Sequence, residues 1–267
     1  MSTLVAPPWA LILAGGDGTR LRPLTRQIAG DSRPKQFCPL VDGETLLDRT
    51  RRRTDLLTTF DRQLIVVTRA HEPYYRYLAE ELAPGRLVVQ PANRGTGPGL
   101  LYPLLRLTEL AGDAPVAVFP ADHFVDDDVA FVSHVEAAVR AVRPRPDLVV
   151  LLGIEAATPE TEYGWIEPNA VPLPVEGDPV FPIRRFWEKP SPRLAERLFE
   201  RGCLWNSFVM VGQAGAFLAL VARRAPELMA AFAPLHDALG RRGEAAAAER
   251  LYAILPDVNF SERVLTQ

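Results

Sequence analysis

The chain has 267 residues, of which 48% are hydrophobic and 24% charged, a composition typical of a globular protein with a substantial core. Its formal net charge of −3 argues against a nucleic-acid partner, and its first apolar stretch, residues 9–14, is too short to span a bilayer. Cys38 and Cys203 are far apart and lack metal-ligand spacing. We therefore expect a reduced, cytoplasmic protein without disulfides and without a membrane role.

Short apolar runs rich in Val, Ile and Leu alternate with amphipathic segments in the first part of the chain. The runs predict strands over residues 9–14, 62–70, 86–92, 115–122 and 147–156. The segments between them predict helices over residues 43–57, 72–83 and 126–142. This alternation predicts an α/β fold, with a Rossmann-like, mainly parallel sheet flanked by helices.

The sequence becomes rich in proline after about Tyr163. Two extended runs around a polar loop predict a hairpin arm that follows the main sheet. Residues 191–202 predict a helix with Ser191 at its N-cap and Pro192 in its first turn. The Ala-rich stretch 213–255 predicts two or three further helices, so the C-terminal part is expected to be helical.

Three glycines, Gly15, Gly16 and Gly18, follow the first predicted strand. The carboxyl ends of strands are where open α/β sheets bind ligands, and glycines let backbone N–H groups approach an anion. The Rossmann fingerprint is absent, because Leu21 stands where its third glycine would be. A Walker loop is absent too, because no Gly-Lys-Ser/Thr ends the run.

Arg20 follows these glycines, and a rigid guanidinium in that place suits a triphosphate. Pro23 is expected to stop the chain from entering a helix. The alternative is a tight glycine turn with a solvated arginine.

The stretch 13–26, LAGGDGTRLRPLTR, resembles the signature loop of the sugar-1-phosphate nucleotidyltransferases, and RPKQFCPL (33–40) resembles the form seen in mannose-1-phosphate guanylyltransferases. Further blocks follow in the family's order: PANRGTGPG (91–99), FPADHFV (119–125), TPETEYGWIEP (158–168), FWEKPS (186–191) and LWNSFVM (204–210). The resemblance implies that GTP and mannose 1-phosphate react, with Mg²⁺ as cofactor, to give GDP-mannose and pyrophosphate. It also implies a single domain over 1–267, with a nucleotide-binding half (1–160) and a sugar-binding half that includes the C-terminal helices (161–267).

The resemblance also implies roles for individual residues. Arg20 and Lys35 would neutralise the triphosphate and the leaving pyrophosphate, and Asp122 would bind Mg²⁺. The nucleotide would be bound by Leu13, Ala14, Gly15, Gly16, Gly18, Thr19, Asn93, Arg94, Gly95 and Thr96. The sugar phosphate would be bound by Tyr163, Gly164, Glu188, Lys189 and Asn206.

Residue chemistry alone leaves several of these positions open. Asp122 ends a buried apolar strand, where a carboxylate is costly unless it is paired or metal-bound. Lys35 can also be read as a surface lysine, and residues 91–99 as a plain connection between a strand and a helix. Glu188 and Lys189 are strand neighbours, which point to opposite faces, so only a local twist could aim both at one ligand.

Two departures from the family pattern bear on function. Phe208 stands where the family usually has glycine, which leaves the identity of the sugar open. The family's second metal-binding aspartate belongs to a segment downstream of residues 255–267, so we expect that the sequence is truncated; the alternative is an incomplete metal site. The alternatives are a transferase for another base or sugar, and a non-catalytic nucleotide-sugar-binding regulatory protein. The sequence does not decide the oligomeric state, and a homodimer is one state that it allows.

Overall fold

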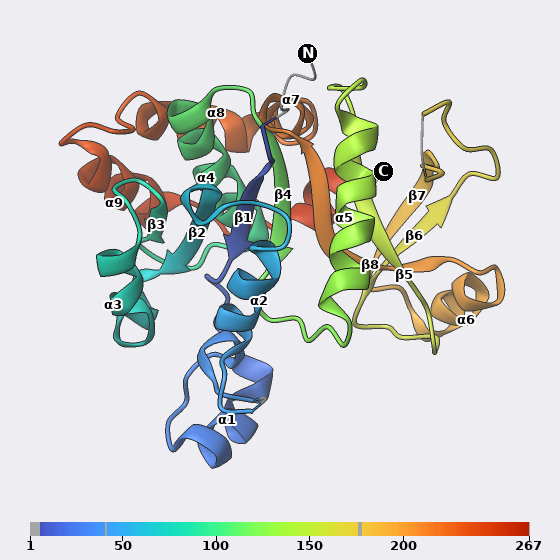
Figure 1. Cartoon of the computed structure of the whole chain (residues 1–267), viewed down its shortest axis with the longest axis horizontal. Coiled ribbons are helices and arrows are strands. Elements are labelled where there is room, and N and C mark those ends of the chain that lie inside the picture. The colour runs from blue at the N-terminus through green and yellow to red at the C-terminus, as the bar shows by residue number, and fades with distance from the viewer. Residues whose placement is uncertain (1–5, 41, 176–177, 267) are drawn as a thin grey trace.

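The fold is built around one mixed sheet, in a computed structural model that describes residues 6–40, 42–175 and 178–266. Within these residues the strand order is β3-β2-β1-β4-β8-β6-β7, and β5 pairs with β8 beside this path (Figure 1). The strands are β1 (Trp9–Leu13), β2 (Gln63–Thr68), β3 (Leu87–Gln90), β4 (Pro115–Pro120), β5 (Val149–Glu155), β6 (Gly164–Pro168), β7 (Ile183–Glu188) and β8 (Leu204–Gln213).

The first half of the sheet is parallel. Strand β1 pairs with β2 on one side and β4 on the other, and β2 pairs with β3. Strand β2 is buried along its whole length, which explains the continuous apolar runs in this part of the sequence. The carboxyl ends of these strands therefore meet at one edge of the sheet. The predicted α/β class, with helices flanking the sheet, is confirmed.

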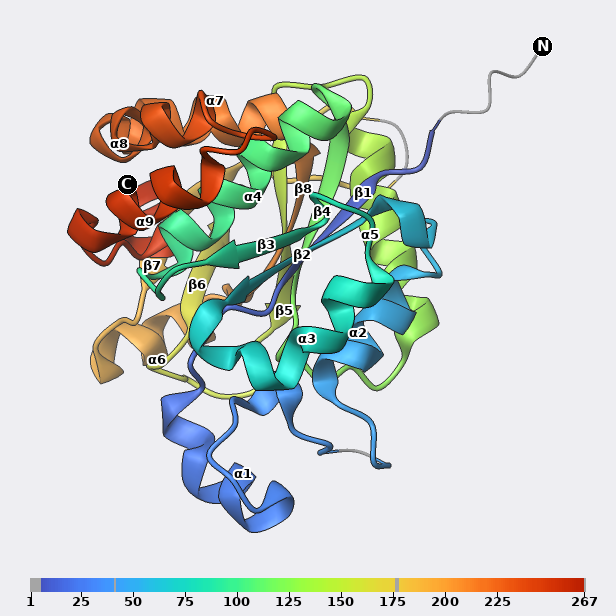
Figure 2. The ribbon, with the colours of Figure 1, turned by 90° about the vertical axis from the view of Figure 1, so that its left-hand side faces the viewer.

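Two layers of helices cover the sheet, and alternate strand residues face each layer. Ile12 packs toward α2 (Leu46–Thr54) and α3 (Glu72–Glu81), whereas its neighbour Leu11 packs toward the opposite layer. Helix α5 (Asp128–Val142) lies on the side of α2 and α3. Figure 2 shows the other layer across the sheet. It consists of α4 (Thr96–Ala111), α7 (Ala214–Arg224), α8 (Pro226–His236) and α9 (Glu244–Ile254).

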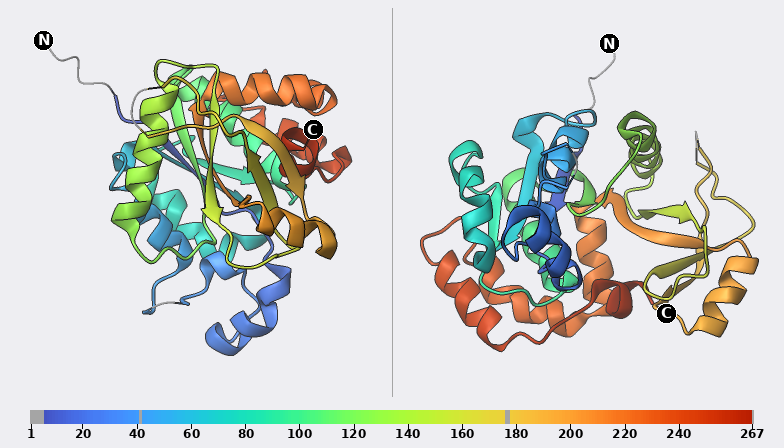
Figure 3. Two further views of the ribbon diagram at one scale, coloured as in Figure 1. Left: turned by 90° about the vertical axis from the view of Figure 1, so that its right-hand side faces the viewer. Right: turned by 90° about the horizontal axis from the view of Figure 1, so that it is seen from below.

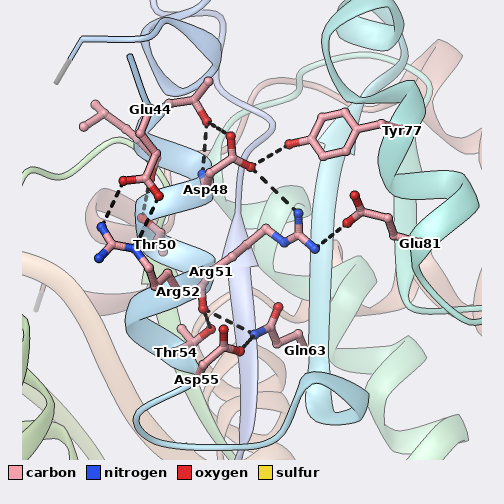
Figure 4. Close-up of polar contacts among 12 residues, drawn as sticks. Glu44, Asp48, Thr50, Arg51, Arg52, Thr54, Asp55, Gln63, Tyr77 and Glu81 are labelled. Carbon is pink, nitrogen blue, oxygen red and sulfur yellow. Dashed lines mark hydrogen bonds and ion pairs between the residues drawn. The ribbon is translucent and has the colours of Figure 1, made fainter. Parts of the chain in front are cut away.

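Polar side chains join α2 to α3 (Figure 4). Tyr77 donates a hydrogen bond to Asp48 over 2.9 Å, and Arg51 pairs with Glu81 at 2.7 Å. Helix α2 itself begins after Thr45, whose hydroxyl accepts from the backbone N–H of Asp48. These contacts hold α2 in place beside the loop that follows β1.

The second half of the sheet is antiparallel. Strand β8 pairs with β4, β5 and β6, and β6 and β7 form the predicted hairpin. Figure 3 shows α6 (Pro192–Glu200) beside this hairpin. The hairpin is joined to the main sheet by the pairing of β6 with β8, which makes it part of the sheet.

Several local predictions were wrong. Strand β8 was not predicted, although it is the longest strand described. Pro23 does not stop a helix but lies in the first turn of α1 (Arg22–Ala29), where proline lacks only an N–H that the helix would leave unpaired. Helix α1 projects away from the sheet (Figure 1). Ser191 is the N-cap of α6, but its side chain makes no capping hydrogen bond.

Across the described part of the chain, the helices are too short or too polar for any of them to traverse a membrane.

Candidate active site

The glycine loop after β1 is tightly fixed by neighbouring strands. The backbone N–H of Ala14 donates to Val66, and the Thr68 hydroxyl donates to the Gly15 carbonyl at 2.8 Å. A Cβ on Gly15 would lie 2.7 Å from the amide nitrogen of Gln90, so no larger residue fits there without rearrangement. A Cβ on Gly16 would meet nothing within 4 Å, so Gly16 borders open space.

Gln36 holds the same loop from the other side. Its buried side-chain amide donates to the Ala14 carbonyl at 3.0 Å and to the Gly16 carbonyl at 2.7 Å. Gly18 has a positive φ of 55°, and a Cβ there would lie 3.1 Å from the backbone nitrogen of Lys35. The RPKQF segment and the glycine loop are thus one packed unit.

Asp17 links this unit to the loop after β3. Its carboxylate accepts from the Asn93 amide at 2.8 Å and lies 3.1 Å from Nε2 of His71. Burial lowers the pKa of His71, although the nearby Asp17 carboxylate opposes that shift. The Asp17 carboxylate is therefore engaged by protein groups, and it stabilises the loop conformation.

Residues Asn93 to Thr96 lie against the segment before the C-terminus. Gly95 has a φ of 82°, and a Cβ there would lie 2.5 Å from the Val258 carbonyl oxygen. Thr96 accepts a hydrogen bond from the Phe260 N–H at 2.8 Å. Arg94 turns toward α9, where it donates to the Tyr252 carbonyl, so the structure does not place it with the other predicted nucleotide-binding residues.

Two cavities meet at Asp122 and His123. The first, which we call the loop cavity, has a volume of about 320 Å³. It is lined by Leu13, Gly15, Gly16, Gln36, Val66, Gln90, Asn93, Gly95, Thr96, Gly99, Pro120, Asp122, His123 and Phe208. The second, the α5 cavity, has a volume of about 870 Å³ and contains Lys35, Tyr163 and Asn206 in its lining. Asp122 therefore stands where ligands in the two cavities would meet.

Asp122 is bracketed by two basic side chains. Its Oδ2 lies 2.9 Å from Nζ of Lys35, and its Oδ1 lies 3.8 Å from Nε2 of His123. Desolvation lowers the pKa of His123, although the nearby Asp122 carboxylate opposes that shift. The paired Lys35 compensates the carboxylate that the sequence placed at the end of a buried strand.

The donor set around Asp122 is compatible with one divalent cation. In residues 6–40, 42–175 and 178–266 there is no cluster of three or more His, Cys, Asp or Glu side chains that could hold a metal. Mg²⁺ commonly binds through one or two carboxylates and completes its shell with water and substrate phosphates. A single half-buried carboxylate that lines two cavities fits that coordination.

Phe208 occupies a bulge of β8. The pairing of β5 with β8 is irregular there, since Leu151 pairs with Met210 but Gly153 pairs with Asn206. Phe208 has a φ of 59°, which is rare for a bulky residue, and its N–H donates to the Asn206 side chain. At this bulge β8 changes partner from β6 to β4, and the Phe208 ring lines the loop cavity.

The predicted sugar-phosphate residues fall into two groups. Tyr163 and Asn206 line the α5 cavity, where the Tyr163 ring packs edge-on against Trp205 at 5.1 Å. Gly164 and Glu188 are paired across the hairpin and line neither cavity. Burial raises the pKa of Glu188, although the Asn259 amide, which donates to it at 3.2 Å, opposes the shift.

Lys189 follows β7 with a φ of 42°. The chain therefore has, at Lys189, the local twist that would be needed to aim Glu188 and Lys189 at one ligand. Its Nζ lies 3.4 Å from Oε2 of Glu162, and Nη1 of Arg20 lies 3.1 Å from the same oxygen. One carboxylate thus bridges a cation of the glycine loop and a cation of the hairpin. Arg20 and Thr19 line neither cavity.

Comparisons with known proteins agree with this geometry. The model of the nucleotidyl transferase family matches residues 9–247. The chain belongs to that family. The family resemblance read from the motifs is therefore confirmed.

The family relatives include the xanthan biosynthesis protein XanB of Xanthomonas campestris pv. campestris, 32% identical over 215 residues. A mannose-1-phosphate guanylyltransferase of Sinorhizobium fredii is 30% identical over 228 residues. These matches cover 78% and 82% of this chain, but only 42% of each relative. A crystal structure from Thermus thermophilus, described as a mannose-1-phosphate geranyltransferase, matches with 32% identity and a TM-score of 0.81, over 97% of this chain and 71% of that chain.

Some residues that shape the site were not predicted from the sequence. Gln36, Asp17 and Glu162 lie inside or beside the quoted motifs, but their roles depend on hydrogen-bond partners distant in the chain. Asn259 lies 71 residues after Glu188 and reaches it only through the fold. Among them, Gln36 had a signal in the sequence, because it stands next to Lys35 in a motif. A polar side chain that is buried in such a turn needs hydrogen-bond partners.

Proposed function

We propose that this chain transfers a guanylyl group from GTP to mannose 1-phosphate, with release of pyrophosphate. The observation that carries the proposal is the position of Asp122 in the lining of both the loop cavity and the α5 cavity, with Lys35 of the α5 cavity 2.9 Å from its carboxylate. The choice of GTP and mannose is supported by the RPKQF motif and by the name of the Sinorhizobium fredii relative.

In the proposed reaction, a phosphate oxygen of mannose 1-phosphate forms a bond to the α-phosphorus of GTP. The bond from that phosphorus to the oxygen that bridges it to the β-phosphorus breaks, and the electron pair leaves with pyrophosphate. The glycine loop, whose carbonyls are held by Gln36, would present a fixed backbone to the triphosphate. Mg²⁺ held by Asp122, when bound, would neutralise phosphate charge.

Lys35 would exchange its contact with Asp122 for the phosphates as the substrates bind. A lysine ammonium is a flexible point charge and suits this change of partner. Arg20 and Lys189 would likewise exchange the Glu162 carboxylate for phosphate oxygens. Both partners of Glu162 are exposed, so the exchange costs little free energy.

The test is a pyrophosphate-release assay on the purified chain with MgCl₂. GTP with mannose 1-phosphate is expected to give the largest kcat/KM. Replacing GTP with ATP, UTP or dTTP, and the sugar with glucose 1-phosphate, tests the base and the sugar separately. Absence of pyrophosphate with every pair, together with tight binding of GDP-mannose, would overturn the proposal in favour of a non-catalytic binding protein.

A further inference from the structure

A third cavity, of about 480 Å³, lies between the β6–β7 hairpin and α6. It is separate in its lining from both the loop cavity and the α5 cavity. Four arginines line it: Arg184, Arg185, Arg197 and Arg201. We call it the arginine cavity; Figure 3 shows the hairpin and the helix that enclose it.

Local geometry explains why the arginines converge. Arg197 and Arg201 are four residues apart at the end of α6, and therefore lie on one face of the helix. Arg185 and Trp187 are two residues apart on β7, and therefore share one face of the strand. Glu167 of β6 lies directly opposite Arg185 in the hairpin register.

The charges in the arginine cavity do not balance. Glu167 is its acidic member, with a side chain only 8% exposed, and it pairs with Arg201 and with Arg184. Arg185 lies over the Trp187 ring, 4.0 Å from its centre. For the Arg197 side chain, neither an ion pair nor a hydrogen bond is found within residues 6–40, 42–175 and 178–266.

Four arginines thus line this cavity beside one buried glutamate, in a chain whose net charge is −3. The Arg184 and Arg201 side chains remain 65% and 49% exposed, so their free N–H groups can reach a ligand. Like charges at short range repel, and an anion bound among them would relieve that repulsion.

We propose that the arginine cavity binds a phosphate-bearing small molecule. The planar guanidinium fork matches phosphate oxygens in a bidentate manner, and several forks in one concavity suit a group with more than one negative charge. The volume lies in the range of small-molecule sites. The proposal does not depend on the catalytic activity, because none of these arginines lines the loop cavity or the α5 cavity.

The test is isothermal titration of the full chain with sodium pyrophosphate in EDTA. The double variant Arg185→Gln/Arg197→Gln removes two cavity charges and leaves both partners of Glu167 in place. The matched control, Arg223→Gln/Arg250→Gln, removes two exposed arginines on α7 and α9, away from the cavity. We expect the wild-type chain and the control to bind pyrophosphate at this site, and the cavity variant to lose one site or at least about tenfold in affinity.

Equal affinity and stoichiometry in the two double variants would overturn the proposal, as would absence of binding by the wild-type chain. Circular dichroism and thermal melting confirm that each variant is folded, and Arg197→Gln alone serves if the double variant is not. Titrations with inorganic phosphate, mannose 1-phosphate and GDP then identify the source. Tighter binding of the last two assigns the site to organic phosphates, and tighter binding of phosphate or pyrophosphate assigns it to inorganic anions.

Discussion

The glycine loop and the β6–β7 hairpin hold their ligand-facing groups in different ways. Buried side chains fix the loop, where Gln36 and Thr68 bond to its carbonyls. On the hairpin side, the Lys189 ammonium makes an exposed ion pair with Glu162. A fixed backbone can present dipoles to a transition state without rearranging, whereas exposed pairs are worth little and can exchange partners. The comparison implies that the loop provides preorganisation and the hairpin provides adaptable charge.

The largest expected effect is on kcat, and it distinguishes Lys35 from Lys189. Lys35→Gln should lower kcat by about 10²–10³-fold, because it removes a cation that lines the α5 cavity and contacts Asp122. Lys189→Gln should chiefly raise KM for the sugar phosphate and change kcat much less. Steady-state kinetics with both substrates varied measures the two parameters. An equal effect of the two substitutions on kcat would contradict the proposed difference between the loop and the hairpin.

The next effect concerns the stability of the loop. Gln36→Leu should lower the free energy of unfolding by about 1–3 kcal/mol, because it leaves the carbonyls of Ala14 and Gly16 without their donor. Urea unfolding at constant pH measures the change. The control is Gln27→Leu at an exposed position of α1, which should have almost no effect. A loss of the same size in the control would show that Gln36 has no special part in fixing the loop.

A smaller effect is expected at the bulge of β8. Phe208→Gly and Phe208→Ala both remove the ring, but only glycine adopts the left-handed conformation without strain. The glycine variant should therefore be more stable than the alanine variant by about 1 kcal/mol, measured by urea unfolding. Equal stability would show that the backbone relaxes at this position. If the ring also narrows the site, the glycine variant should accept sugars that the wild-type chain rejects.

The smallest effect is a pH dependence from His71. Because burial lowers its pKa in the folded chain, the unfolded chain binds the proton more readily. The stability contribution is complete above the unfolded pKa of about 6.5 and is lost as the pH falls below it. Urea unfolding from pH 8 down to pH 5 should show a shallower decline in His71→Gln than in the wild-type chain. Identical slopes in His71→Gln and in the wild-type chain would exclude His71 as the cause.

Local signals were enough to predict the parallel half of the fold. The runs at 9–14, 62–70 and 115–122 became β1, β2 and β4 because strands buried on both faces need continuous apolar residues. Strand β8 was missed since its sequence, LWNSFVMVGQ, mixes polar and apolar residues without a regular period. Its irregular pattern follows from the bulge at Phe208 and from its three different partner strands.

The motifs likewise indicated which residues to expect at the site, but not how those residues are arranged. Asp122 and Lys35 were expected at one site, and the structure places their charged atoms 2.9 Å apart. Arg94 could not be excluded from the sequence, because its partner, the Tyr252 carbonyl, comes 158 residues later. Contacts of this kind depend on how helices pack across the sheet, and no short-range pattern encodes them.

The most direct test of the central claim follows the phosphates of GTP. The chain would be incubated with mannose 1-phosphate, MgCl₂ and GTP that is radiolabelled at either the α- or the γ-phosphate, and the products separated. The account predicts that the α-label appears in a sugar nucleotide and the γ-label in pyrophosphate, and that Asp122→Asn suppresses both. Recovery of the γ-label in inorganic phosphate, with the α-label left in GDP, would contradict nucleotidyl transfer at this site.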